Sequence, residues 1–283
     1  ELVKTGESLT KIPDSAWARL RHDTLSKNEQ AIYATVDKLL EMPKFKKVRR
    51  NLLFLASGYR KIGNYEIGPW FNWISANQWE GTRLRFDLGT NTYFNKDLYL
   101  HGYLAYGFRD KSFKGKAEAY WIIKRKPNWL RLHAAYTDDV DNGINQVGEV
   151  SQDNIFSLAI RKPNVTRKFI RTRDIRFEVF HELGKGFSTE WFIVHRQHTP
   201  LQSLPVKSYY PVSGGTPLTN FEVALKLRFA YLERFLETDY FRTSLGTKYP
   251  IVEFMFTKGI KGIFNSAYNY SKYSLAIKDF MKI

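Results

Sequence analysis

QWEGTRLRFDLGT, residues 78–90, alternates between charged and apolar side chains from Arg83 onward. Neighbouring side chains in an extended strand point to opposite faces, so the pattern predicts a β-strand with one charged and one apolar face. The charged face holds Arg83, Arg85 and Asp87, and the apolar face holds Leu84, Phe86 and Leu88. A soluble sheet and a membrane-spanning sheet both alternate in this way, so the fold class depends on which face meets water.

The chain from residue 81 onward contains roughly ten strand-like segments separated by turn residues, as antiparallel β-sandwiches and β-barrels do. After the first, they cover residues 98–108, 115–125, 129–137, 154–161, 174–183, 187–198, 221–231, 252–257 and 273–279. The connections at 95–97 and 184–186 are short, whereas those at 137–153 and 199–220 are long and polar. Alternation of short turns with long loops is typical of outer-membrane barrels.

Strand length and aromatic placement also favour a membrane. The segments are about ten residues long, against ~5–6 for strands of globular sheets. Aromatic pairs lie near their ends, as in the girdles at membrane interfaces: Tyr93 and Phe94, Tyr106 and Phe108, Trp129 and Tyr136, Phe229 and Tyr231. We therefore predict an all-β fold, an antiparallel transmembrane β-barrel over residues 51–283, with charged residues such as Lys226 and Arg228 facing its lumen. A soluble β-sandwich or β-barrel is the alternative.

Residues 1–50 read differently, as a helical and linker segment. Ser26 and Glu29 form a capping box before apolar residues at helical spacing, and Pro43 lies just past the predicted helix. This amphipathic helix either packs on the domain that follows, lies at a membrane interface or docks a partner. The basic run KFKKVRR, residues 44–50, reads as a solvated linker or as a segment near phosphates.

The charge balance predicts an anionic partner. The chain has 44 Lys and Arg against 28 Asp and Glu, a net charge of +16, and it has no cysteine. The basic residues are spread over all strands and turns rather than gathered in one stripe, so we expect lipid headgroups rather than nucleic acid. No apolar run is long enough for a transmembrane helix.

Catalytic and cofactor motifs are absent from the sequence, including G-x-S-x-G, H-E-x-x-H and the glycine-rich nucleotide loops. His195 and His198 are expected on opposite faces of one strand, whereas His101 and His133 could approach across strands. The acidic run at 138–143 is reminiscent of a calcium loop but lacks the spacing of the terminal Glu. We expect no enzyme activity, no cofactor and no metal site, and calcium binding at 138–143 stays open.

Residues 74–121 also hold a specific block of motifs: E-G-x-R-L-R at 80–85, G-Y-x-A-Y-G at 102–107 and D-K-x-F-K at 110–114. With these motifs the block resembles a family of outer-membrane proteins of the Bacteroidota. In that family a carboxypeptidase-regulatory-like domain precedes a barrel of unknown function, itself similar to surface-antigen barrels. Residues 16–39 and 248–262 look like the family's helical segment and later strands. The family's small N-terminal domain is missing here, and its barrel normally continues past IKDFMKI, so we expect an incomplete barrel.

The resemblance implies a non-enzymatic subunit or accessory of outer-membrane protein assembly and envelope biogenesis. It places the barrel in the cell outer membrane and residues 1–50 in the periplasm. The implied partners are outer-membrane lipids, including lipopolysaccharide, and other outer-membrane or periplasmic subunits. A passive channel or transporter, a lipid-modifying barrel enzyme and a soluble binding barrel are the alternatives. The motif positions that we expect in the lumen are Glu80, Gly81, Arg83, Arg85, Asp110 and Lys111.

Overall fold

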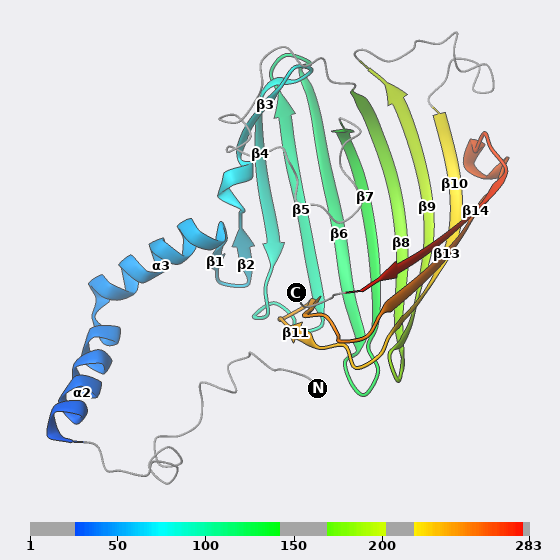
Figure 1. Cartoon of the computed structure of the whole chain (residues 1–283). Coiled ribbons are helices and arrows are strands. Elements are labelled where there is room, and N and C mark those ends of the chain that lie inside the picture. The colour runs from blue at the N-terminus through cyan, green and yellow to red at the C-terminus, as the bar shows by residue number, and fades with distance from the viewer. Residues whose placement is uncertain (1–25, 142–168, 202–217, 280–283) are drawn as a thin grey trace.

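A twelve-stranded antiparallel sheet dominates the computed structural model, which describes residues 26–141, 169–201 and 218–279. Its strands follow one another in chain order, and β1 and β14 are the two ends, so the sheet is open in the described residues (Figure 1). The predicted all-β antiparallel fold is confirmed. The strand expected at 154–161 lies outside the described residues.

The strands from β4 onward are long enough to form a curved wall (Figure 1). The sheet consists of β1 (Arg60–Ile62), β2 (Tyr65–Ile67), β3 (Ile74–Asn77), β4 (Gly81–Thr90), β5 (Leu98–Gly107), β6 (Ser112–Lys124), β7 (Leu130–Asp141), β8 (Ile170–Gly184), β9 (Phe187–Pro200), β10 (Leu218–Ala230), β13 (Ile251–Gly259) and β14 (Tyr270–Lys278). Both β2 and β3 pair with β4 on the side away from β5.

Strand β7 is longer than the sequence predicts. Residues from 137 onward were expected to form a polar loop, but β7 continues to Asp141 and pairs with β8 down to Ile170. Arg171 and Arg173 of β8 bind the carboxylate of Asp138 at 2.7 and 3.0 Å. These cross-strand ion pairs hold an acidic segment in the sheet although it has no apolar alternation.

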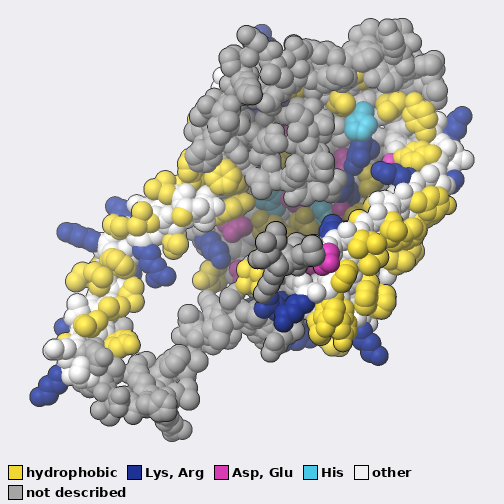
Figure 2. Space-filling view, viewed as in Figure 1, with side chains coloured by type: hydrophobic (Ala, Val, Ile, Leu, Met, Phe, Trp, Pro, Cys, Tyr) yellow, Lys and Arg dark blue, Asp and Glu magenta, His cyan; other side chains and the backbone are white. Residues whose placement is uncertain are grey.

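In a soluble β-sandwich the apolar face of each sheet is buried and the polar face is exposed, whereas here the apolar face is exposed and the charged face is buried. On β4, Phe86 is 54% exposed, whereas its neighbour Asp87 is fully buried. Leu84 and Leu88 share the exposed outer face with Phe86, and Arg83 and Asp87 share the inner face. Charged and histidine side chains are visible in the hollow of the molecule, and apolar ones cover the outside of β13 and β14 (Figure 2).

A small aromatic core closes one end of the hollow. Tyr99, Ile122, Trp129 and Tyr240 form its buried cluster. Tyr240 belongs to the connection between β10 and β13, which contains the hairpin of β11 (Phe235–Glu237) and β12 (Arg242–Ser244). We call residues 231–250 the floor segment, because it folds across the end of the wall at which β4 and β6 finish (Figure 1). The sequence reading did not predict it.

Two helices precede the sheet: α2 (Lys27–Glu41) and α3 (Pro43–Ser57). The first confirms the predicted helix. The basic run at 44–50 is helical, not a linker, so the helical segment ends at Ser57 rather than at residue 50. Its residue types favour a helix, because Lys, Arg and Leu have good helix propensity and Pro43 occupies the first turn. No helix among the described residues is long and apolar enough to cross a membrane.

Candidate functional site

A buried charge cluster lies on the inner face where β4 begins. The carboxylate of Glu80 has no exposed area and binds Lys114 Nζ at 2.7 Å and Arg83 Nη1 at 3.2 Å. Arg83 also donates two hydrogen bonds of 2.7 Å to the carboxylate of Asp139 on β7. Lys114 completes the cluster with an ion pair of 2.5 Å to Asp110. Each buried charge therefore has an opposite partner, which burial requires.

A tight turn before β4 aims Glu80 into this cluster. The side-chain oxygen of Asn77 accepts hydrogen bonds from the backbone N–H groups of Trp79 and Glu80, at 3.0 and 2.7 Å. Gly81 follows with φ of 70°, a left-handed conformation that glycine adopts without strain. A Cβ at Gly81 would also lie 3.0 Å from Arg109 Cβ. The E-G pair of the motif thus sets both the turn and the direction of the carboxylate.

A second chain of contacts crosses the inner face from β5 to β8. His101 Nδ1 lies 2.9 Å from Glu118, and His133 Nε2 lies 3.2 Å from the same carboxylate. His133 Nδ1 lies 2.9 Å from Glu178 on β8. His101 and His133 therefore do approach across strands, through a shared glutamate on β6. His195 and His198 lie on opposite faces of β9, as their spacing predicts: His195 packs on Phe264 and His198 lies beside Thr172.

The structure brings together four of the six motif positions singled out from the sequence. Glu80, Gly81, Arg83 and Asp110 lie in or beside the first cluster, and Arg85 binds Asp87 at 2.8 Å further along β4. Lys111 is apart from them: it is exposed in the turn between β5 and β6 with φ of 49°.

Sequence reasoning missed several partners of these residues. Lys114 ends the D-K-x-F-K motif but was not assigned to the site. It and Glu118 could have been found, because both fall on the polar positions of the alternating residues 114–125. Asp139 could not, because it was assigned to a loop. The carboxylates of Asp138 and Asp139 are bound by arginines, and residues 142 and 143 lie outside the described range. No group of metal-ligating side chains was found among the residues that the structure describes.

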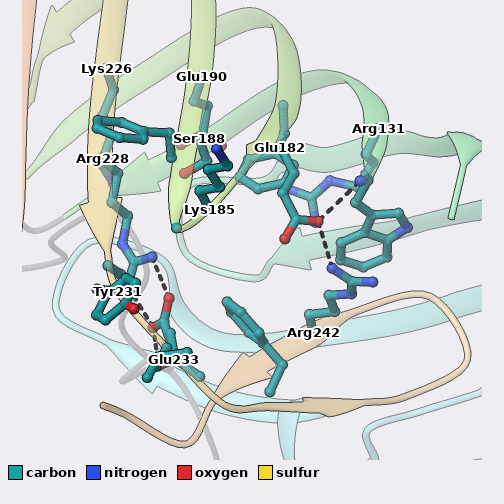
Figure 3. Close-up of a pocket in the computed structure, with 18 residues that line it drawn as sticks. Arg131, Glu182, Lys185, Ser188, Glu190, Lys226, Arg228, Tyr231, Glu233 and Arg242 are labelled. Carbon is teal, nitrogen blue, oxygen red and sulfur yellow. Dashed lines mark hydrogen bonds and ion pairs between the residues drawn. The ribbon is translucent and has the colours of Figure 1, made fainter. Parts of the chain in front are cut away.

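A cavity of about 390 Å³ lies beyond the second chain of contacts, between the wall and the floor segment (Figure 3). Its walls combine aromatic rings, such as Trp129 and Phe180, with charged groups from β7 to β10. Arg131 has no acidic partner among the described residues, and its guanidinium lies 5.4 and 5.8 Å from the rings of Tyr120 and Phe180. The cavity can therefore hold a polar or charged group beside aromatic surface. In its lining, the hydroxyl of Ser244 donates a hydrogen bond to the carboxylate of Glu233, which Arg228 also binds.

Ion pairs fasten the floor segment beneath the cavity (Figure 3). Glu233 accepts two hydrogen bonds from Arg228, at 2.5 and 2.6 Å. Arg242 binds Glu182 at 2.9 Å and stacks over Trp129, with its guanidinium carbon 4.3 Å from the ring centre. Burial raises the pKa of Tyr240 to about 12, so the phenol stays protonated and donates a hydrogen bond of 2.6 Å to the carbonyl of Asn95.

Arg242→Gln tests how the floor segment is held. The substitution removes the ion pair to Glu182 and the stacking on Trp129, so we expect the segment to open more easily by about 2–3 kcal/mol. Hydrogen exchange of the amides in β11 and β12 should be faster by a factor of roughly 30 to 150. Arg234→Gln is the matched control, because Arg234 belongs to the same segment and is exposed. Equal exchange in the two variants would contradict this role of Arg242.

Comparison with known proteins gives one match. A family model described as "Family of unknown function (DUF5686) C-terminal domain" matches residues 56–283. No curated protein and no solved structure matches the sequence. The matched range begins near the end of α3 and includes every strand of the sheet, both inner-face clusters and the floor segment.

Proposed function

The chain belongs to the DUF5686 C-terminal domain family, and from that premise we propose that it is a membrane-spanning β-barrel protein of the outer membrane. We further propose that it serves envelope biogenesis as a non-enzymatic subunit or accessory of outer-membrane protein assembly. One observation carries the membrane proposal: the wall exposes its apolar face and buries its charged face.

The exposed apolar side chains form a band that crosses the wall from β4 to β14. Each strand contributes at least one large side chain that is more than about a third exposed: Phe86, Leu104, Trp121, Tyr136, Ile175, Trp191, Leu227, Phe254 and Leu275. Soluble monomers rarely expose contiguous apolar patches above a few hundred Å². A lipid environment removes the cost of this surface, because the band then contacts hydrocarbon.

Strand length supports the same environment. The strands of the wall, β4 to β10 with β13 and β14, contain 9 to 15 residues, for example 9 in β13 and 15 in β8. A tilted strand needs about 9–11 residues to cross the hydrocarbon core. Exposed aromatic residues such as Tyr93, Phe108 and Phe187 lie at or just beyond strand ends, where interfacial girdles are found.

The lengths of the connections between strands indicate which end of the wall faces the periplasm. Short connections join β4 to β5, β6 to β7 and β8 to β9 at one end of the wall. At the other end β5 to β6 is also short, but the connections from β7 to β8 and from β9 to β10 are long. The β1–β2 hairpin lies at this same end, because Tyr65 pairs with Thr90, the last residue of β4. Since short turns of outer-membrane barrels face the periplasm, we propose that α2, α3 and the floor segment lie on the periplasmic side.

The assembly role is supported by the resemblance of the 74–121 block and by the open sheet. β14 has no strand partner on its outer side among the described residues. Unpaired backbone groups are costly in lipid, so a further strand must cover this edge in a membrane. We propose that it comes either from a longer form of this chain or from an assembly partner, and that the other partners are outer-membrane lipids including lipopolysaccharide. A passive channel is less favoured, because the floor segment covers one end of the hollow.

Membrane fractionation tests the membrane proposal. We expect the protein to stay with membranes through an alkaline carbonate wash and to need detergent for extraction, because its apolar band is exposed. A protein that stays in solution without detergent would instead support the soluble binding barrel.

Co-purification from native membranes tests the assembly role separately. We expect assembly-machinery subunits to accompany the protein after gentle detergent extraction. Conductance in a planar bilayer would favour the channel, and lipid hydrolysis by the purified protein would favour an enzyme. A membrane-bound protein that never copurifies with such subunits would remove the assembly role alone.

A further inference from the structure

Helices α2 and α3 expose apolar faces that the rest of the described chain does not cover. On α2 the face consists of Ile32, Val36, Leu39 and Leu40, which are 41–61% exposed. On α3 it includes Val48, Leu52 and Leu55, which are 54–60% exposed, and α3 has no buried residue. Of the three alternatives for the N-terminal helix, packing on the domain that follows does not occur in the described residues.

The spacing places these side chains on one side of each helix. Positions 32, 36 and 39 on α2, and positions 45, 48, 52 and 55 on α3, recur every three or four residues and so share a face. Phe54 points elsewhere, toward Trp73, with ring centres 6.3 Å apart. It fastens the end of α3 to the sheet and leaves the apolar face of α3 free.

The charge of α3 identifies what covers this face. Within residues 43–50 the chain has five cations and no acid, and α3 has no acidic residue at all. At about 100° per residue, Lys44 and Arg49 flank the apolar face on its two sides, while Lys47 and Arg50 lie on the far side. An apolar face bordered by cations matches a layer of anionic headgroups above hydrocarbon.

The position of the helices agrees with that surface. Gly58 ends α3 in a left-handed conformation, and the chain then enters β1 and β2 beside the end of β4. Both helices extend sideways from the outer side of the wall rather than across the hollow (Figure 1), and their apolar side chains are visible along them in Figure 2. Gly58 accepts a hydrogen bond from Trp70 N and Gly68 donates one to the carbonyl of Asp87, so α3 joins the wall about three residues before the end of β4. From there the two helices run away from the wall toward the end at which β4 finishes, where the headgroup layer would lie (Figure 1).

We propose that α2 and α3 bind the surface of an anionic phospholipid bilayer, with their apolar faces in the headgroup region and the cations of α3 on the lipid phosphates. This inference rests on the proposed membrane location of the sheet. It gives the N-terminal segment a function of its own: it is a second membrane contact, in the plane of the bilayer, that fixes how the barrel is oriented.

The absence of cysteine allows a direct test, since a single introduced cysteine is the only labelling site. The full chain carrying Leu52→Cys and a polarity-sensitive fluorophore is reconstituted in phosphatidylcholine vesicles that contain brominated lipid, with or without phosphatidylglycerol. We expect bromine to quench the label at position 52 when phosphatidylglycerol is present, and to quench a label at Arg50→Cys, on the far side of α3, much less. Leu104→Cys, on the outer face of β5, reports insertion of the sheet itself.

Charge variants show whether membrane binding depends on the cations of α3 or only on the net positive charge of the protein. Lys44→Gln with Arg49→Gln should weaken the partition of the helices about thirtyfold, at about fivefold for each cation near an anionic surface. Lys248→Gln with Lys261→Gln removes two exposed cations elsewhere and should leave quenching unchanged. Quenching at position 104 but not at 52 would overturn the inference and leave the proposed function intact. So would a label at 52 that is shielded by protein rather than quenched by lipid. Absence of quenching at 104 would instead contradict the membrane proposal.

Discussion

Phe86→Arg is expected to lower the free energy of unfolding in a bilayer by about 2–4 kcal/mol, although the phenyl ring is 54% exposed. Phe86 lies in the middle of β4 on its outer face, between Leu84 and Leu88. If that face meets hydrocarbon, the guanidinium must be buried in lipid near the centre of the strand. On a water-facing surface the same substitution would change stability by no more than about 0.5 kcal/mol.

Thr82→Arg is the matched control for this prediction. Thr82 shares the outer face of β4 and is exposed, but it lies near the start of the strand, where an arginine can reach the interface. We expect it to cost about 0–1 kcal/mol. Denaturant titration of both variants in lipid vesicles measures the difference. Equal costs for Thr82→Arg and Phe86→Arg would show that depth along the strand is irrelevant, contrary to a lipid-facing wall.

Glu80→Gln is expected to destabilise the protein by about 3–5 kcal/mol, because it breaks a buried ion pair from one side. Glu80 has no exposed area, and its loss leaves Lys114 with Asp110 alone and Arg83 with Asp139 alone. Buried cations that lose a partner retain their desolvation cost. The free energy of unfolding, measured by denaturant titration in one detergent, should fall accordingly.

Two further variants show whether burial causes this effect. Glu80→Gln combined with Lys114→Met removes both charges of the pair, and we expect it to recover a large part of the lost stability. Asp97→Asn removes an acid that binds Arg125 at 2.9 Å but is 53% exposed, and it should cost less than about 1 kcal/mol. A double variant as unstable as Glu80→Gln alone would rule out the uncompensated charge as the cause.

The faces of the strands were predictable from the sequence because their signal is local. In β4 the alternation from Arg83 to Leu88 already assigned each side chain to the face on which it lies. The turn at Asn77 to Gly81 was readable only as an acid–glycine pair before a strand. That Glu80 binds Lys114 depends on the pairing of β4, β5 and β6, which no local pattern specifies.

Other elements were missed for separate physical reasons. Arg171 and Arg173 begin β8 with charges on the outer face, so apolar alternation started too late to mark the strand. Tyr240 is buried by contact with Tyr99, far away in the chain, with ring centres 4.9 Å apart. Helix α3 was read as a basic linker because its cations obscured the apolar spacing of Val48, Leu52 and Leu55.

In the proposed membrane protein, the exposed apolar face of the wall meets lipid and the buried charged face lines the hollow. The most direct measurement is the accessibility of single spin labels at positions 83 to 88 in reconstituted vesicles, one cysteine at a time. We predict a period of two, with high oxygen and low nickel-chelate accessibility at 84, 86 and 88 and restricted access to both at 83, 85 and 87. High accessibility of positions 84, 86 and 88 to the water-soluble chelate would show that this face meets water rather than lipid.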